Sequence, residues 1–287
     1  SISTNSTNIA SNDTDIATNT SSISTNTSNI SSNDTDIAAN TSSISTNSTN
    51  ISTNSSAIST INDTTLANFS SGARVYQDDT LYNTAVGYNA LSVNTIGAYN
   101  TAFGYEALYS NDAGYDNTAI GSSALYNNTS GSFNTAIGSA SLYYNSSGLN
   151  NTAVGYTSLY NNTTGSYNTS SGYASLYANT TGESNTASGY RSLNNNTTGS
   201  YNSAFGQGVL SSNTEGSFNV GFGNQALANN TSGYENVSIG AGSLQNNITG
   251  NQNTAVGQSS LYDNVDGSQN TSIGSFSSRF RTSGDGN

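Results

Sequence analysis

Two hydrophobic periods divide the chain. From residue 2 to residue 58 an isoleucine stands at every seventh position, and an asparagine follows three residues after each of the first eight. A heptad repeat sustained this long is typical of a left-handed coiled coil. We therefore predict a parallel coiled-coil stalk over residues 1–66, with isoleucine at core position a and asparagine at d. The predicted core isoleucines are Ile2, Ile9, Ile16, Ile23, Ile30, Ile37, Ile44, Ile51 and Ile58.

Helix propensity opposes a single isolated helix in this stretch. Its remaining positions are mostly Ser, Thr and Asn, which are poorer helix formers than Ala. The segment is therefore expected to be helical only as an oligomer whose asparagine layers have hydrogen-bond partners. An irregular extended stalk or disorder are the alternatives, although a polar linker has no reason to keep isoleucine in register.

A second period, of 17 residues, begins at Tyr82 and runs to Gly274. An asparagine recurs twelve times, from Asn83 to Asn270, always 17 residues apart, and the consensus of the unit is N-T-A-[VIF]-G-x-x-[AS]-L-Y-x-N-[TN]-[TS]-G-x-[YFQ]. A unit this short fits one coil of a β-solenoid, with two short strands and two turns. We predict a β-roll of about twelve repeats over residues 82–275. Repeated glycines are expected at its turns, as at Gly87, Gly97, Gly104, Gly114, Gly121 and Gly131.

Stacking such coils aligns identical residues into rows. The Val/Ile/Phe row (residues 86, 103, 120, 137 and 154) and the Leu row are expected to form apolar stripes, and the Asn rows hydrogen-bonded ladders. Asn and Gly of the Asn-Thr/Ser-Gly segment suit left-handed positions of a tight turn. A roll this thin has too little core to stand alone, so we expect its apolar stripes to be shared between chains.

Two short segments lie outside both repeats. Residues 67–81 are predicted to form a connector, in which Gly72, Arg74 and the Asp78–Asp79 pair carry no catalytic pattern. Residues 276–287 depart from the repeat and are expected to be a cap or the start of a next domain, with a ligand-binding tip as the alternative. The chain begins within a repeat and has no Met, so we expect it to be a segment of a longer polypeptide.

The composition argues against several classes of partner and of catalytic or metal site. The net charge is -12 with four Arg and no Lys, which argues against nucleic-acid or anionic-membrane partners. No apolar run is long enough to predict membrane insertion. Without His, Cys or Lys, nucleophile–base arrangements and imidazole or thiolate metal sites are excluded in this sequence. We expect no metal site and no catalytic residues, since the carboxylates share no repeat position.

The I-x-x-N-T repeat resembles the stalk of trimeric autotransporter adhesins and of some viral fibres. That resemblance implies a parallel homotrimer in which three d-position asparagines hold chloride or a similar anion on the threefold axis. Water-bridged asparagine layers are the alternative. Asn12 and Asn33 are followed by Asp, which disfavours an anion there. The implied anion-binding residues are Asn5, Asn19, Asn26, Asn40, Asn47 and Asn54.

The unit N-T-A-I-G-x-x-[AS] resembles the head repeat of the same adhesins, the YadA-like left-handed parallel β-roll, and repeats of phage-type tail-fibre proteins. This resemblance implies a trimeric left-handed roll. The adhesin coils are a few residues shorter, so a larger outer turn is expected here. In the adhesins the head precedes the stalk, whereas the stalk comes first in this chain, which favours a fibre.

Together these patterns predict a homotrimeric, non-enzymatic attachment fibre on a virion or cell surface, with an extracellular location and a cell-surface or glycan target. A bacterial surface adhesin, a self-assembling extracellular filament and, last, a fibre-borne polysaccharide depolymerase are the alternatives. A tyrosine recurs after the repeat leucine and is expected to form an aromatic ladder. Its role would be stacking between coils or, alternatively, glycan binding. The ladder residues are Tyr109, Tyr126, Tyr143, Tyr160 and Tyr177.

Overall fold

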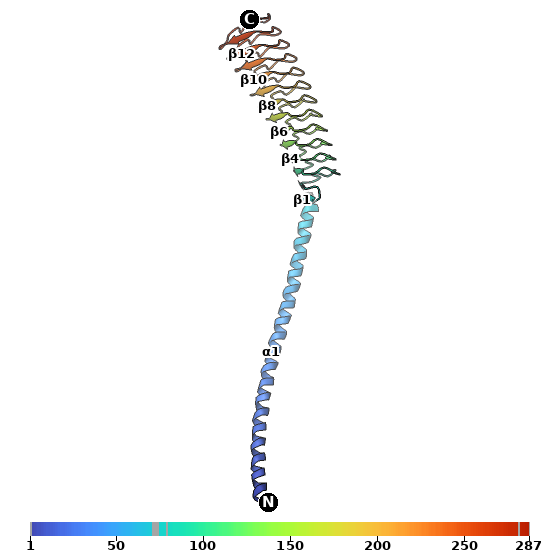
Figure 1. The fold of residues 1–287 in the computed structure, drawn as a ribbon, viewed down its shortest axis with the longest axis vertical. Helices are drawn as coiled ribbons and strands as arrows, with labels where there is room; N and C mark the ends of the chain where they lie inside the picture. Colours follow the sequence, from blue (N-terminus) through green and yellow to red (C-terminus); the bar gives the residue numbers. More distant parts are fainter. Residues whose placement is uncertain (1, 71–74, 79, 281, 287) are drawn as a thin grey trace. The chain divides into compact units, whose positions relative to one another are not determined.

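The computed structural model describes residues 2–70, 75–78, 80–280 and 282–286 of the chain. These residues form one long helix and one sheet of thirteen short strands (Figure 1). The chain divides into two units, residues 1–67 and residues 68–287. Each unit is described here by itself.

The first unit consists almost entirely of helix α1 (Ile2–Ser70), which extends four residues beyond the predicted end of the stalk. Many of its hydroxyl side chains donate to the carbonyl four residues earlier, as Thr20 does to Ile16 O and Thr27 to Ile23 O, both at 2.8 Å. Such bonds satisfy Ser and Thr on the helix surface without any packing partner. The predicted helix is present, and the polar composition does not interrupt it.

The isoleucines of α1 form an exposed row on the single chain. Their exposed fractions lie between 59% at Ile58 and 86% at Ile2. All other side chains from residue 2 to residue 59 are exposed as well. No described residue of the chain covers this apolar row.

The second unit is a parallel β-solenoid with 17-residue coils, as the repeat predicts. Strand β1 pairs antiparallel with β2, and the strands from β2 to β13 then pair in parallel in chain order. Each residue lies opposite its equivalent in the next coil, for example Ala102 opposite Ala119. The strands are β1 (Val75–Asp78), β2 (Asn83–Val86), β3 (Thr101–Phe103), β4 (Thr118–Ile120), β5 (Thr135–Ile137), β6 (Thr152–Val154), β7 (Thr169–Ser171), β8 (Thr186–Ser188), β9 (Ser203–Phe205), β10 (Val220–Phe222), β11 (Val237–Ile239), β12 (Thr254–Val256) and β13 (Thr271–Ile273).

The expectation of two strands per coil is wrong, because within the described residues each coil of the repeat has one. The repeat leucines, expected in a second strand, have φ angles of 48–55°, in the left-handed helical region. This conformation costs roughly 1–2 kcal/mol for a residue with a side chain. Burying the leucine returns roughly 1.5–3 kcal/mol, and the backbone still bonds between coils, as from Leu108 N to Ala124 O at 2.8 Å.

The left-handed residues also differ from those predicted. Besides the leucine, they are the residue two places before it and the residue before the first repeat asparagine, for example Glu106 (φ 52°) and Tyr99 (φ 58°). Asn128 and Gly131 of an Asn-Thr/Ser-Gly segment do not have positive φ. Gly131 is instead required by space, since a Cβ there would collide with the Asn128 side chain.

The core of the roll is narrow and lies inside each coil. It is built from the strand alanine, the alanine or serine before the leucine, and the leucine itself, and the leucines from Leu108 to Leu244 are fully buried. Where a residue of one core row differs from the consensus in size or polarity, a neighbouring core residue differs in a way that fills the space or supplies a hydrogen bond. Val209 fills the space opposite Gly221, where an added Cβ would collide with the valine. Where Ser170 replaces the strand alanine, its hydroxyl lies 2.5 Å from that of Ser175.

The Val/Ile/Phe row is a stripe, but it points out of the roll. Phe103, Ile120, Ile137 and Val154 are each between 36% and 42% exposed, while the alanine before each of them is buried. The alternation follows from strand geometry, in which neighbouring side chains point to opposite faces. Only the leucine and alanine rows therefore form the core of a single chain.

The segments flanking the repeat are described in part. Gly72, Arg74 and Asp79 of the predicted connector lie outside the described residues, while Asp78 belongs to β1. After β13 the backbone keeps the spacing of the coils, with bonds from Leu261 N to Ser277 O and from Gly286 N to Ser268 O. A cap or a following domain at residues 276–287 remains a prediction.

Candidate functional site

Two buried asparagine ladders run through the roll. In the first, Asn100 N donates to Asn83 Oδ1 at 2.8 Å, and Asn100 Nδ2 donates to Gly114 O at 2.8 Å. In the second, Asn111 Nδ2 donates to Asn94 Oδ1 at 2.8 Å and to the same Gly114 O at 2.9 Å. This scheme repeats in the following coils, as at Asn117. The predicted ladders are present, and their role is to fix the spacing of the coils.

The six asparagines predicted to hold an anion are all exposed on the single chain. Seven residues of helix advance about 10.5 Å along the axis, so one chain presents its carboxamides singly. No two of them approach closely enough within one helix to share a ligand. A site at Asn19 or Asn26 therefore needs the same residue from other chains.

Outward-facing tyrosines form the predicted ladder. The rings of Tyr126 and Tyr143 lie 4.9 Å apart with planes 2° from parallel, and those of Tyr160 and Tyr177 lie 5.2 Å apart with planes 3° from parallel. Tyr109 stacks on Tyr126 at 5.0 Å. Stacking between coils is confirmed. Because the ring faces cover one another, a ladder presents mainly ring edges and hydroxyls to solvent.

Burial within this ladder changes the acidity of its phenols. Burial, followed by the neighbouring Tyr144, raises the pKa of Tyr160 from 10.0 to about 12. Burial is also the main cause of the raised pKa of Tyr126 and Tyr143. These phenols therefore stay protonated at neutral pH and serve as hydrogen-bonding groups without charge.

Sequence inspection missed a second tyrosine ladder, which follows the strand glycine. Tyr156 stacks on Tyr173 with ring centroids 5.4 Å apart, and Tyr173 stacks on Tyr190 at 5.3 Å. Tyr88 and Tyr105 form a separate pair at 5.5 Å. The 17-residue spacing of these tyrosines was the available signal, but interruptions between Tyr105 and Tyr156 hide it.

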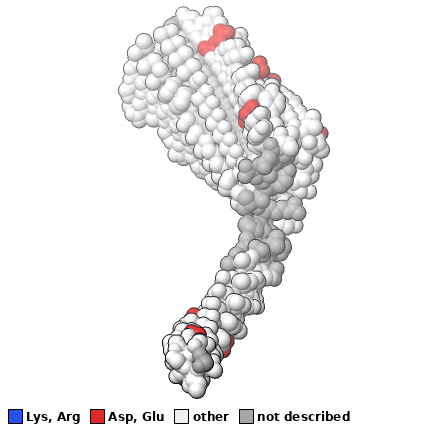
Figure 2. All heavy atoms as spheres, turned by 60° about the horizontal axis from the view of Figure 1, so that its bottom comes forward, with Lys and Arg blue, Asp and Glu red and all other residues white. Residues whose placement is uncertain are grey.

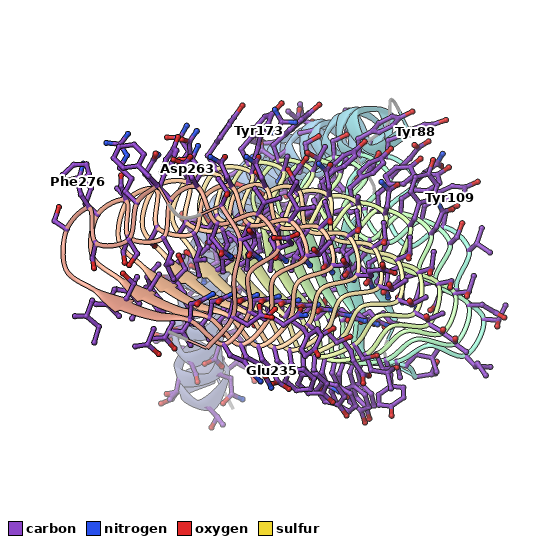
Figure 3. The ribbon with its side chains drawn as sticks, turned by 90° about the horizontal axis from the view of Figure 1, so that it is seen from above. Tyr88, Tyr109, Tyr173, Glu235, Asp263 and Phe276 are labelled. Atoms are coloured by element: carbon purple, nitrogen blue, oxygen red, sulfur yellow. The ribbon has the colours of Figure 1, made fainter. Side chains whose placement is uncertain are left out.

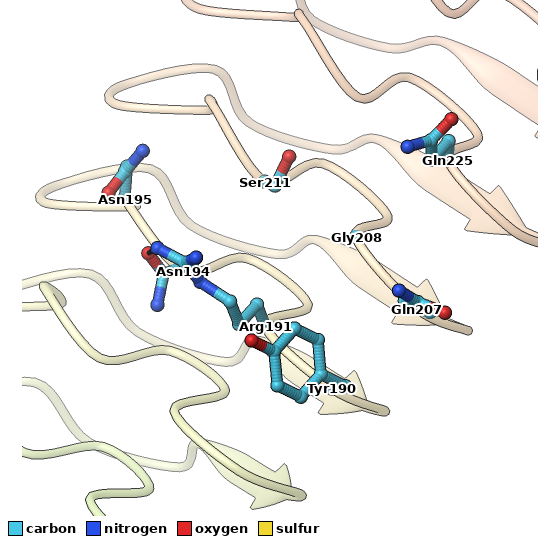
Figure 4. A pocket seen from close by; sticks show the side chains of 8 residues that line it. All are labelled: Tyr190, Arg191, Asn194, Asn195, Gln207, Gly208, Ser211 and Gln225. Atoms are coloured by element: carbon cyan, nitrogen blue, oxygen red, sulfur yellow. Dashed lines mark hydrogen bonds between the residues drawn. The ribbon is translucent and has the colours of Figure 1, made fainter.

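Both ladders end in the same region, and the surface there is hollowed (Figure 4). The next equivalents of Tyr177 and Tyr190 are Asn194 and Gln207, which have no ring. Two adjoining depressions of about 310 and about 560 Å³ lie here, and both are lined by Tyr190 and Arg191. Small-ligand sites have volumes of about 300–1,000 Å³, and both depressions fall within that range.

The charge around this region is unusual for the molecule. The chain has sixteen carboxylates against four Arg, and Arg191 is the only cation between residues 82 and 278. Elsewhere acidic side chains are scattered singly, and the face shown in Figure 2 has a few of them and no visible Lys or Arg. Figure 3 shows Tyr88, Tyr173 and Asp263 on one side of the roll and Glu235 on the opposite side.

Within the described ranges, no three or more His, Cys, Asp or Glu side chains gather closely enough to hold a metal ion. No described helix combines the length and apolar character needed to cross a bilayer. Comparisons with protein-family models, with curated proteins and with solved structures found no match to this chain.

Proposed function

We propose that this chain is a segment of a homotrimeric attachment fibre, in which α1 forms a parallel three-stranded coiled coil and the solenoid forms a left-handed trimeric roll. One observation supports the proposal most: both units expose an unbroken or nearly unbroken apolar row on the single chain. The isoleucine row of α1 is at least 59% exposed throughout. Contiguous exposed apolar surface of this kind marks protein interaction sites.

The two rows favour copies of the same chain as partners. The isoleucines recur every seven residues, the spacing that lets identical helices interlock. The outward Val/Ile/Phe row recurs every coil, interrupted by Ser171 and Ser188, so identical rolls meet in register. Three chains satisfy both patterns and bring three equivalents of Asn19 together on one axis. Their amide groups would converge there, and chloride or a similar anion supports such a layer.

The proposed task is mechanical reach with multivalent, non-enzymatic adhesion to a cell-surface or glycan target, from a virion or a cell surface. The asparagine ladders support this task, because they brace every coil against the next within the chain. A rigid trimer presents three copies of any surface site, which raises avidity without new contacts.

Light scattering of the purified full chain tests the assembly. The expected mass is three times 29.4 kDa, unchanged between about 1 and 50 µM. A mass of one chain at micromolar concentration would contradict the proposal, and masses that grow with concentration would indicate a filament instead. Bromide soaking of trimer crystals tests the anion layers: anomalous signal is expected on the axis at Asn19 and Asn26.

Adhesion is tested with fluorescently labelled trimers on cells and on immobilised surface glycans. Retention after washing is expected, together with no new reducing ends in the glycan supernatant. Release of reducing ends would favour the depolymerase alternative, and lack of retention on every surface would contradict attachment.

A further inference from the structure

We propose that the depression around Arg191 is a binding site for a carboxylate-bearing saccharide. The inference deepens the proposed attachment function, on which it rests, by naming the chemical class of the target. It is carried by three features that coincide at one place on the roll: the ends of two tyrosine ladders, a guanidinium with no carboxylate partner among the described residues and a cluster of carboxamides.

At the ladder ends, Tyr190 is 49% exposed and Tyr177 is half-buried. Inside a ladder each tyrosine is covered by its neighbours, as Tyr173 is by Tyr156 and Tyr190. The last rings, Tyr177 and Tyr190, have a stacking partner on one side only, because Asn194 and Gln207 follow them. A ring face carries negative charge density, which attracts the polarised C–H groups on the flat side of a pyranose. Tyr190 therefore offers a sugar a ring face on which no further tyrosine stacks.

Arg191 supplies the charge recognition. The structure gives its guanidinium one side-chain hydrogen bond, from Nη2 to Asn194 Oδ1 at 3.5 Å, the limit of such a contact. The residues at the same repeat position in the adjoining coils are Ala174 and Gly208, so space is left on both sides of the arginine. Guanidinium groups bind carboxylates through paired hydrogen bonds. No described carboxylate of the chain forms such a pair with Arg191.

Asn194 holds this arrangement in place. Its side chain is 94% buried, since only 6% is exposed, and its Nδ2 donates to Ala174 O at 2.8 Å. The bond fixes its Oδ1 toward Arg191. Asn195, Gln207 and Gln225 surround the depression with donors and acceptors that suit sugar hydroxyls (Figure 4). Polar rim, ring platform and one cation together match an acidic sugar better than a neutral one.

The repeat supplies matched variants that keep the fold. Gln225 occupies the position of Arg191 two coils later, also with a left-handed backbone (φ 57° against 54°), so Arg191→Gln removes the charge without new strain. The double variant R191Q/Q225R keeps the net charge and moves the cation two coils away. Ser122 and Ser139 stand at the position of Tyr190 in other coils, which makes Tyr190→Ser tolerable. Tyr88→Ser is the control in the same row, six coils away.

The experiment measures binding of the full-length trimer to four acidic oligosaccharides: trigalacturonate, trimannuronate, a hyaluronan tetrasaccharide and sialyllactose. Their neutral counterparts are the methyl esters and, for the last, lactose. Saturation-transfer NMR and calorimetry are expected to detect at least one acidic form and to show it binding more tightly than its counterpart. Arg191→Gln, R191Q/Q225R and Tyr190→Ser are each expected to weaken that binding about tenfold or more, as for loss of a charged hydrogen bond or ring contact.

Three results would overturn the inference: no binding of any acidic form, equal binding by Arg191→Gln, or full binding by R191Q/Q225R, which would show a general charge effect. Tyr88→Ser is expected to bind as the unmodified chain does, and weakened binding there would also contradict the site. Mass and cell retention are measured on the same samples. If they persist without saccharide binding, this inference fails and the attachment proposal stands.

Discussion

Helix α1 and the roll handle apolar side chains in opposite ways. In the roll, the leucines from Leu108 to Leu244 have no exposed surface, although each coil has only 17 residues. In α1, each isoleucine from Ile2 to Ile58 is more than half exposed. A coil is covered by the coils before and after it, whereas a straight helix has no neighbour in its own chain. A repeat therefore specifies a closed core only when successive units stack on one another.

The same contrast holds for asparagine. In the roll, Asn162 is fully buried and donates both to Asn145 Oδ1 and to Gly165 O at 2.8 Å. In the helix, Asn26 has the same side chain at an equally regular position, and it is exposed. The roll uses its carboxamides to bind its own coils together. The helix leaves its carboxamides exposed on the single chain.

The largest expected effect comes from removing isoleucines from the helix. In the proposed trimer, Ile23→Ser with Ile30→Ser should lower the stability of the stalk by about 4 kcal/mol per chain, because each isoleucine buried between chains would contribute roughly 2 kcal/mol. Circular dichroism at 222 nm against temperature measures the loss. Tyrosine fluorescence reports the roll alone, since residues 1–70 contain no Tyr, and it should not change.

Ser21→Ala with Ser28→Ala is the matched control, because both serines lie off the isoleucine row. This control should leave the helix signal equal or slightly raised, as Ala favours helix. If the isoleucine variant melts as the unmodified chain does, the helix is stable without a covered row and the proposed coiled coil is wrong.

A glycine substitution should unfold the roll and leave the helix intact. Gly121 has a φ of 134°, and an added Cβ would lie 2.6 Å from Gly138 O in the next coil. Gly121→Ala is therefore expected to cost about 3 kcal/mol or more through backbone strain and collision. Urea unfolding followed by tyrosine fluorescence measures this cost. Ser122→Ala, at a position where another coil carries Ala241, should have almost no effect.

A smaller effect is expected from breaking one ladder. Asn162→Ala leaves Asn145 Oδ1 and Gly165 O with fewer donors and should cost about 1–3 kcal/mol, the usual penalty for buried polar groups without partners. The neighbouring Asn161→Ala is the control, because Ala178 stands at that position in the next coil. Equal unfolding midpoints for the two variants would show that the ladder does not stabilise the coils.

Much of the architecture could be predicted from the sequence because identical residues at a fixed period must stack. The period gave the coil length, the parallel register and the two asparagine rows. It did not reveal which side of the strand faces inward. The small Ala119 is buried and the larger, more apolar Ile120 is exposed, the opposite of what side-chain size and apolarity would suggest. A core that also holds leucine and two asparagines leaves room for only a small side chain at the strand.

Residue propensities did not predict the backbone conformation of the segment around the repeat leucine. Leucine rarely adopts the left-handed backbone conformation, so the Leu-Tyr sequence did not predict the φ of 53° at Leu108. Closure of the coil and burial of the leucine override the local preference.

The candidate saccharide site was missed for another reason. It lies where Asn194 and Gln207 interrupt the two tyrosine rows, and a repeat pattern predicts only the positions that recur.

The smallest expected effect concerns pH and again separates the two units. Burial raises the pKa of Tyr160 to about 12, so the folded roll holds this phenol proton more tightly than the unfolded chain, whose tyrosines titrate near 10. The resulting stability is complete below pH 10 and is lost as the pH rises from 10 through 12. The fluorescence melting temperature of the roll should fall over that window, and Tyr160→Phe should fall less steeply. The helix has no tyrosine and should show no step attributable to phenol ionisation in circular dichroism between pH 10 and 12. Parallel curves for the variant and the unmodified roll would mean that Tyr160 is not protected by the ladder.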